Sequence, residues 1–244
     1  MPRYLMTIRF DGTMYHGWQV QKNAVSVQQT VQDAFENALS LRPGITGCSR
    51  TDSGVHANKY CFHFDLENDI APKGITAALN SKLPKDICAV DCNYVPDDFH
   101  ARYGVLKKRY VYRIYTGKIR DPFLFRYSYH CKRNLNADIM NKAAEKFIGK
   151  YDFSSFCASG SSVEDNTRTV FSATVSKKGD IIEFAVEADG FLYNMVRIMA
   201  GTLIDVGAAK LSPSDIPTII AKKDRSAAGA TAPAQGLFLD DVIY

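Results

Sequence analysis

Hydrophobic and polar positions along the first hundred residues alternate with two distinct periods. A period of two indicates strands, and a period near 3.6 residues indicates amphipathic helices. Ser26 followed by Gln29 resembles a capping box and fixes the start of the first helix. The pattern predicts the order strand, helix, strand, strand, helix, strand, over residues 4–10, 26–39, 45–48, 60–66, 72–83 and 87–95. This order is that of a β-α-β-β-α-β split unit.

The second half of the chain gives a similar order of elements without a repeat at the level of residues. Strands are expected at 108–116, at 127–133 beside it, and at 236–244; helices at 136–149, 191–206 and 213–223; and a hairpin over 167–188. Two split units set edge to edge would form one long sheet with a central cleft. The Ser-rich segment 157–167 is the best candidate for a mobile loop.

Composition narrows the class of protein. The chain has 244 residues, of which 46% are hydrophobic, so it can bury a core. Its net charge of +4 permits a polyanionic partner without indicating one. The apolar segment 191–207 contains Asn194, Arg197 and Asp205 and is too polar to span a bilayer. The N-terminus resembles a strand and lacks the long apolar stretch of a signal peptide.

The cysteines and histidines indicate no metal site. The six cysteines form no C-x-x-C pair, and the five histidines are scattered. Most cysteines lie among apolar residues, as in "ICAV" and "YCFHF", so we expect buried, reduced thiols and a cytoplasmic protein. The chain also lacks phosphate-binding glycine loops, so a metal-dependent or nucleotide-driven reaction is poorly supported.

The stretch "GCSRTDSGVHA", residues 47–57, places Asp52 in a polar turn directly after a strand. A carboxylate there can accept backbone N–H bonds in the turn, neutralise Arg50, or take part in chemistry. The turn alone does not decide among these roles.

The stretch "FHARYGVLKKRYVYRIY", residues 99–115, combines aromatic and basic positions. In a strand, Tyr110 and Tyr112 lie on one face, and Arg109 and Arg113 on the other. Such a strand is typical of surfaces that stack bases and bind phosphates. A buried aromatic face with a solvated basic face explains the pattern equally well.

Arg197 lies among the apolar positions of the helix expected at 191–206. An arginine so placed either meets an acidic partner or extends its charged end to solvent. Asp52 is a suitable acid in the other half of the chain.

These motifs resemble the tRNA pseudouridine synthase A family. "SRTDSGVHA" is similar to the family signature R-T-D-[AS]-G-V-H-A, and four further blocks match in order, at 10–35, 99–114, 189–207 and 232–244. The resemblance implies a homodimer that converts uridines 38, 39 and 40 of the tRNA anticodon stem-loop to pseudouridine. It also implies two ferredoxin-like halves flanking a cleft, which makes the fold α+β with a continuous, mostly antiparallel sheet. Residues 1–104 would carry the catalytic loop and 105–244 would carry Tyr110 and Arg197.

The resemblance also implies the roles of the candidate residues. The reaction exchanges a C1′–N1 bond for a C1′–C5 bond, so it needs no cofactor, metal or fuel. Asp52 would act as the nucleophile, at C6 or at C1′, or would remove the C2′ proton. Tyr110 would stack on the uracil and accept the C5 proton. Arg50 would fill the space of the flipped nucleotide or hold its phosphate, and Arg197 would pair with Asp52 and keep it ionised.

Two other functions stay open at this point. A non-catalytic RNA-binding protein on ferredoxin-like units would bind without product and would not need Asp52. A carboxylate-dependent hydrolase usually needs a second acid at a defined distance, and the motif around Asp52 contains none. Release of the hydrogen from C5 of uridine without cleavage of the RNA separates the isomerase from both.

Overall fold

The computed structural model describes residues 1–160 and 163–244 and divides the chain into two compact units. Unit 1 comprises residues 1–106 and 239–244, and unit 2 comprises residues 107–238; each is described by itself. The sequence-based division placed all of 105–244 in one half, whereas the structure groups the last six residues with unit 1. Residues 161–162, inside the expected mobile loop, lie outside the described residues.

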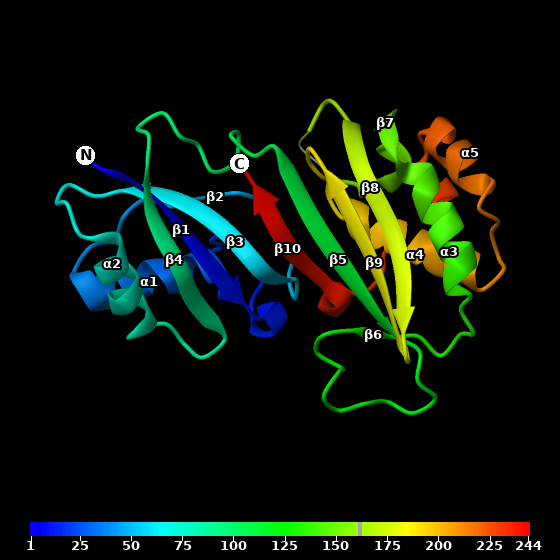
Figure 1. Ribbon diagram of the computed structural model, residues 1–244, viewed down its shortest axis with the longest axis horizontal. Helices are drawn as coiled ribbons and strands as arrows, with labels where there is room; N and C mark the ends of the chain where they lie inside the picture. The colour runs from blue at the N-terminus through cyan, green and yellow to red at the C-terminus, as the bar shows by residue number, and fades with distance from the viewer. Residues whose placement is uncertain (161–162) are drawn as a thin grey trace. The chain divides into compact units, whose positions relative to one another are not determined.

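Unit 1 has the order of elements that its hydrophobic pattern predicts. Strand β1 lies between β3 and β4 and is antiparallel to both, while β2 pairs with β3 (Figure 1). This arrangement confirms a β-α-β-β-α-β split unit. Its elements are β1 (Arg3–Phe10), α1 (Val27–Leu39), β2 (Thr46–Gly47), β3 (His56–Asp65), α2 (Pro72–Asn80) and β4 (Ile87–Val95).

The core of unit 1 follows from this alternation. Every second side chain of β1 is buried, and Tyr4, Met6 and Ile8 are fully enclosed. Phe35 of α1 packs edge-on against Phe64 of β3, with ring centroids 4.9 Å apart. The Ser26 side chain accepts a hydrogen bond from Gln29 N at 3.3 Å, so the helix begins where the sequence indicates.

The strands of unit 2 pair antiparallel in the order β5-β9-β8-β7, with β6 pairing parallel to β5 (Figure 1). The α+β class is therefore confirmed. The cleft expected between the two halves stays a prediction. The elements of unit 2 are β5 (Lys107–Tyr115), β6 (Tyr129–His130), α3 (Ala137–Ala144), β7 (Gly149–Asp152), β8 (Thr167–Lys178), β9 (Ile181–Ala188), α4 (Met195–Gly207) and α5 (Asp215–Lys222). Strand β10 (Leu237–Ile243) carries the chain from unit 2 into unit 1.

Short 3₁₀ helices complete the described structure. They are η1 (Gly12–Met14), η2 (Glu145–Phe147), η3 (Ser154–Phe156), η4 (Arg225–Ala227) and η5 (Ala234–Gly236). Helix η1 follows β1 directly and begins the segment that supports the candidate catalytic loop.

Helix α4 begins later than its hydrophobic pattern suggests. The pattern predicts a helix from residue 191, but α4 starts at Met195. Asn194 adopts a left-handed conformation with φ of 59°, which separates the preceding turn from the helix. Leu192 is nevertheless buried, which explains why its position resembles part of the helical stripe.

All six cysteines are reduced thiols, and five of them are buried. The expectation of burial is wrong for Cys88, which is exposed. In β4 the neighbours Ile87 and Ala89 point into the core, so the alternation of the strand directs Cys88 to solvent. Within the described residues, no helix is long and apolar enough to cross a membrane.

Candidate active site

The candidate catalytic loop, residues 48–55, connects β2 to β3 in unit 1 and carries Asp52, whose side chain is half-buried. Backbone hydrogen bonds fix the loop at several points. Cys48 N donates to Cys61 O at 2.8 Å, and Val55 N donates to Asp52 O at 3.2 Å. In the same loop, Thr51 O accepts a hydrogen bond from Trp18 N at 3.3 Å. The carboxylate therefore sits on a backbone that is held in place independently of its own side chain.

The segment after β1 lies directly against this loop. Gly54 N donates to Tyr15 O at 3.1 Å, and the Ser53 hydroxyl donates to the same oxygen at 3.3 Å. A Cβ atom at Gly12 would lie 1.9 Å from Val55 O, and one at Gly17 would lie 2.2 Å from Thr51 O. Gly17 also has a φ of +83°. Only glycine permits this approach of two backbones at both positions.

Tyr15 anchors this support in the core of unit 1. Its side chain is 5% exposed, and its hydroxyl donates to Asp86 Oδ1 at 2.8 Å. Burial, reinforced by the hydrogen bond to Asp86, raises the pKa of Tyr15, so the phenol remains a neutral donor. A buried neighbour, Trp18, stacks on Tyr60 with ring centroids 4.1 Å apart, and the Tyr60 hydroxyl donates to Ser49 O. The loop is thus supported by aromatic side chains as well as by backbone bonds.

Arg50 and Thr51, the two residues before Asp52, differ in their surroundings. Arg50 is exposed, and no hydrogen bond or ion pair to another described residue occupies its guanidinium. The Thr51 hydroxyl oxygen is buried and lacks a hydrogen-bond partner among the described residues. The Arg50 side chain is therefore available to contact a nucleotide, whereas the Thr51 side chain is buried within the protein.

Unit 2 carries Tyr110, which is 5% exposed on β5. Its ring packs edge-on against Phe191, with centroids 5.1 Å apart. The next residue on the same face, Tyr112, is fully buried and donates its hydroxyl to Pro233 O at 2.7 Å. Burial raises the pKa of Tyr112, which keeps this structural phenol protonated. The aromatic face of β5 is therefore largely core, and Tyr110 lies at its beginning.

Arg197 lies in the first turn of α4 and is half-buried. Its Nε donates to Ala232 O at 2.8 Å, and its Nη1 donates to Asn194 Oδ1 at 2.6 Å. These bonds fix the plane of the guanidinium within unit 2. The sequence pattern indicated neither partner, because Ala232 is distant in the chain and Asn194 was expected inside the helix.

The structure thus brings the four predicted site residues together in two pairs. Asp52 and Arg50 share one loop of unit 1, whereas Tyr110 and Arg197 both contact the segment 191–194 of unit 2. The ion pair between Asp52 and Arg197 stays a prediction. Among the described residues, no group of three or more His, Cys, Asp or Glu side chains could hold a metal ion.

Comparisons with known proteins find a family model and relatives that match this chain. Residues 6–104 and 143–244 match the family model of tRNA pseudouridine synthase. The chain is 45% identical to tRNA pseudouridine synthase A of Thermoanaerobacter sp. (strain X514), with 100% of both chains covered. It is 42% identical to tRNA pseudouridine synthase A of Bacillus subtilis (strain 168), with 99% of both covered.

A solved structure is also similar. A chain of "Structure of H/ACA RNP bound to a substrate RNA containing 2'-deoxyuridine" has a TM-score of 0.38 and 12% identity, over 83% of this chain and 44% of that chain. This likeness is too slight to carry an argument. The family match includes Asp52, Arg50 and Arg197, while Tyr110 lies between the two matched stretches. From this match and from the identity over its whole length, the chain belongs to the tRNA pseudouridine synthase family.

Proposed function

We propose that this isomerase converts uridines 38, 39 and 40 of the tRNA anticodon stem-loop to pseudouridine, with Asp52 as the nucleophile. Its class, isomerisation of uridine in tRNA, follows from family membership. The target positions and the residue roles are the proposal. The observation that carries it is the half-buried Asp52 carboxylate on a loop clamped by the segment around Gly12 and Gly17.

The reaction requires one carboxylate in a fixed position. The C1′–N1 bond breaks, the uracil turns, C1′ bonds to C5, and the proton on C5 is replaced by one on N1. Asp52 acts as the nucleophile at C1′ or at C6 and is regenerated when the new bond is complete. Its loop is fixed by backbone bonds at Thr51 and Gly54, so little reorganisation is needed to bring the carboxylate to the sugar.

A uridine in a stem must leave the stack before Asp52 reaches it, which costs a few kcal/mol. Arg50, exposed two residues before Asp52, is suited to fill the space or to hold the nucleotide's phosphate. Tyr110 would stack on the extruded uracil and accept the C5 proton, directly or through water. Arg197, whose guanidinium plane is fixed by Ala232 and Asn194, would pair with Asp52 and orient its carboxylate.

We further propose that the protein acts as a homodimer in the cytoplasm. The buried, reduced cysteines support a reducing compartment. A homodimer is the state that the sequence resemblance implies. Light scattering of the purified protein tests this state, and a monomer at working concentrations would contradict it.

The experiment that tests the function uses a tRNA transcript labelled with tritium at C5 of uridine. The purified protein should release tritium from positions 38–40 and leave the RNA chain intact. Binding without release would indicate a non-catalytic RNA-binding protein, and cleavage would indicate a hydrolase. Release from other positions alone would contradict the proposed targets.

A further inference from the structure

A second region of unit 2, whose lining includes neither Tyr110 nor Arg197, forms a pocket with a cavity volume of about 840 Å³. It is formed where β5 and β6 end and where β8 turns into β9. Thr116 donates to Asp180 O twice, from its backbone N at 2.8 Å and from its hydroxyl at 2.9 Å. Cys131 N donates to Tyr115 O at 2.8 Å, so backbone bonds hold the wall of the pocket.

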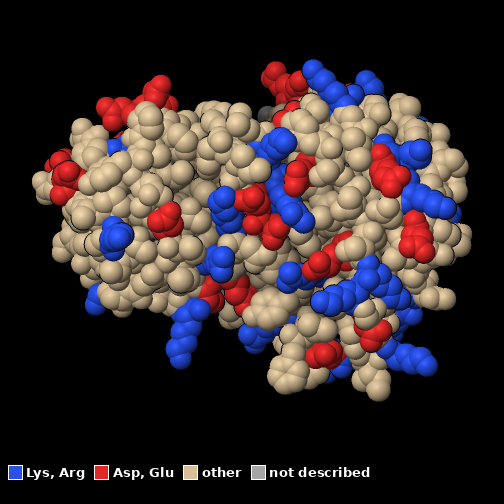
Figure 2. All heavy atoms as spheres, in the orientation of Figure 1, with Lys and Arg blue, Asp and Glu red and all other residues tan. Residues whose placement is uncertain are grey.

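The pocket carries an excess of positive charge. Lys118, Lys132 and Lys177 line it, all three side chains are exposed, and none makes an ion pair with another described residue. Asp180 supplies one carboxylate at the rim. Figure 2 shows Lys and Arg side chains gathered at this end of unit 2, around the lower end of β8. Cations around a concave surface raise the local concentration of anions.

A fourth cation of the pocket is already paired. Arg133 Nη1 lies 2.6 Å from Asp205 Oδ1, and Lys210 lies 3.7 Å from the same oxygen. The three lysines are therefore the groups available for a negatively charged ligand.

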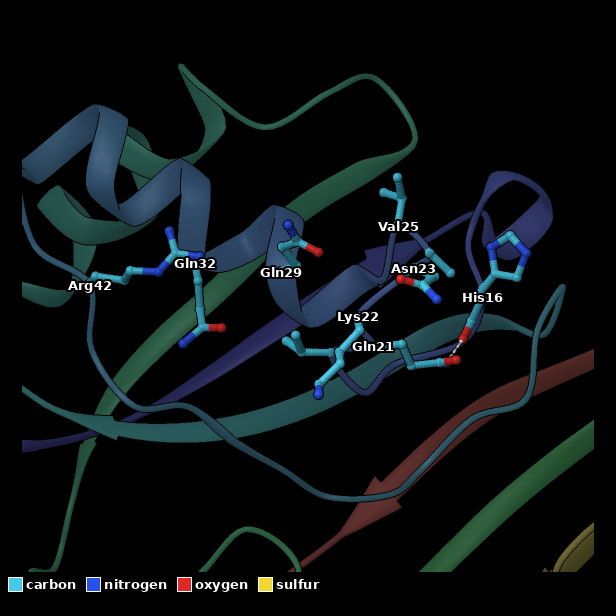
Figure 3. A pocket seen from close by; sticks show the side chains of 10 residues that line it. His16, Gln21, Lys22, Asn23, Val25, Gln29, Gln32 and Arg42 are labelled. Carbon is cyan, nitrogen blue, oxygen red and sulfur yellow. Dashed lines mark hydrogen bonds between the residues drawn. The ribbon is translucent and has the colours of Figure 1, made fainter.

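The pocket of unit 1 shows that a hollow with cations need not be an anion site. Its cavity volume is about 580 Å³, and it carries Lys22 and Arg42 (Figure 3). Arg42 makes ion pairs with Asp33 at 2.7 Å and Glu36 at 2.6 Å, so its charge is balanced within the protein. Most other polar groups there are neutral, and Gln21 is bound to His16 O. Three unbalanced lysines distinguish the pocket of unit 2.

The loop between β5 and β6, which contains Lys118, also carries exposed aromatic rings. Phe123 is 85% exposed and Phe125 is 50% exposed. Ile119, which is 80% exposed, belongs both to this loop and to the pocket. Exposed flat rings next to lysines are typical of surfaces that bind nucleic acids and are not needed to hold a small anion.

We propose that the pocket formed by Lys118, Lys132 and Lys177 binds phosphate groups of the tRNA backbone, at a distance from the reacting uridine. This inference rests on the proposed function. Tyr110 and Tyr115 are five residues apart on β5, so the pocket lies about 17 Å along the strand from the ring that would stack on the uracil. Each lysine that contacts a phosphate releases counterions and strengthens binding at low salt.

The test is the triple substitution Lys118→Gln, Lys132→Gln and Lys177→Gln. Kinetics and filter binding are measured on tRNA at salt concentrations from about 50 to about 300 mM. At about 100 mM salt, KM and Kd should rise about tenfold or more, while kcat stays unchanged. The slope of log binding constant against log salt should flatten by about 3, or about 1 for each lysine.

A matched control removes the same charge from unit 1. Lys73, Lys82 and Lys85 are exposed on and after α2 and make no ion pair with a described residue. The triple substitution of these lysines by Gln should leave KM and the salt slope close to those of the unsubstituted protein. If both triple variants weaken binding equally, net charge alone is responsible and the site is wrong.

Other outcomes also decide the proposal. The proposal is wrong if the pocket variant binds tRNA with the same Kd and the same salt slope as the unsubstituted protein. It is also wrong if light scattering shows that the variant changes its oligomeric state, because the surface would then hold a second copy of the chain. If melting shows that the triple variant does not fold, each single substitution must still flatten the slope by about 1. Filter binding measures the affinity of the pocket for tRNA even if no tritium is released. A failure of the proposed catalytic function can therefore be distinguished from a failure of the pocket proposal.

Discussion

The loop around Asp52 in unit 1 and the elements around Tyr110 and Arg197 in unit 2 hold their candidate functional side chains in different ways. The loop is fixed by its backbone, through Thr51 and Gly54. Tyr110 and Arg197 instead take part in the packing and hydrogen bonding of unit 2. A change at Asp52 should therefore affect chemistry alone, whereas changes in unit 2 should affect chemistry and stability together.

Substitution of Arg197 should show this coupling most strongly. Arg197→Met retains a long apolar stem and removes the donors to Ala232 O and Asn194 Oδ1. We expect kcat to fall about a thousandfold, because the cation proposed to orient Asp52 is lost. The free energy of unfolding should fall by about 1–3 kcal/mol, because two acceptors lose their partner.

Arg197→Lys separates charge from shape. It retains the cation but not the planar fork, so its kcat should lie between those of the unsubstituted protein and Arg197→Met. Kinetics and urea unfolding are measured on both variants. Normal kcat in a folded Arg197→Met protein would exclude a role for Arg197 in positioning the carboxylate.

Tyr110→Phe tests whether unit 2 contributes chemistry or only a ring. The substitution retains the edge-on contact with Phe191 and removes the hydroxyl. We expect kcat to fall about a hundredfold, the range for a lost general base, with nearly unchanged affinity for tRNA. Tyr110→Leu should weaken binding as well. Full activity of Tyr110→Phe would show that the hydroxyl does not accept the C5 proton.

Gly17→Ala tests the backbone clamp of unit 1, which is the close approach of the segment around Gly12 and Gly17 to the loop that carries Asp52. The added Cβ would meet Thr51 O at 2.2 Å, at a residue with a φ of +83°. We expect kcat to fall about tenfold as the loop moves, and a loss of about 1–3 kcal/mol in unfolding free energy.

Gly179→Ala is the matched control for the clamp. Gly179, in the β8–β9 turn, has a φ of +58°, and an added Cβ would meet no heavy atom within 4 Å. It should cost about 1 kcal/mol of stability without a change in kcat. Equal kcat values for the two alanine variants would contradict a role of the clamp in catalysis.

The smallest expected effect concerns stability at a site away from the loop. Arg3 makes two bonds of 2.8 Å to the Asp65 carboxylate. The hydrogen bond from Arg3 lowers the pKa of Asp65, so this contribution to stability is complete above the unfolded pKa near 3.9 and is lost as the pH falls through the lower folded pKa.

Asp65→Asn should therefore lower the free energy of unfolding by about 0.5–1 kcal/mol at pH 7, because solvent screens the half-exposed pair. The difference from the unsubstituted protein should shrink below pH 4, and kcat should not change. Urea unfolding at several pH values measures this. A difference that grows at low pH would contradict the assigned direction.

The order of elements could be predicted from sequence because it depends on local periodicity. Alternation located β1 and β4, and Ser26 located the start of α1. Three features depend on more than periodicity. Asn194 interrupts the stripe of α4 with a left-handed residue, β3 begins at His56 within the signature motif, and β7 is too short to show alternation.

The candidate site could be predicted only as residue types. The motif identified Asp52 and Arg50, but their support by Gly12 and Gly17 depends on contacts between distant parts of the chain. The Arg197 bond to Ala232 likewise spans 35 positions. Gly12 and Gly17 are the feature of the sequence that could have indicated this support, since glycine is often needed where backbones approach closely.

The most direct test of the account compares Asp52→Asn with the unsubstituted protein on the same C5-tritiated tRNA. The substitution nearly preserves the shape of the side chain and leaves the backbone bonds of the loop in place. We expect tritium release to be abolished, while the Kd for tRNA stays within about tenfold and the melting temperature is unchanged. Appreciable release by Asp52→Asn, with deamidation to Asp excluded by mass spectrometry, would contradict the assignment of Asp52 as the nucleophile.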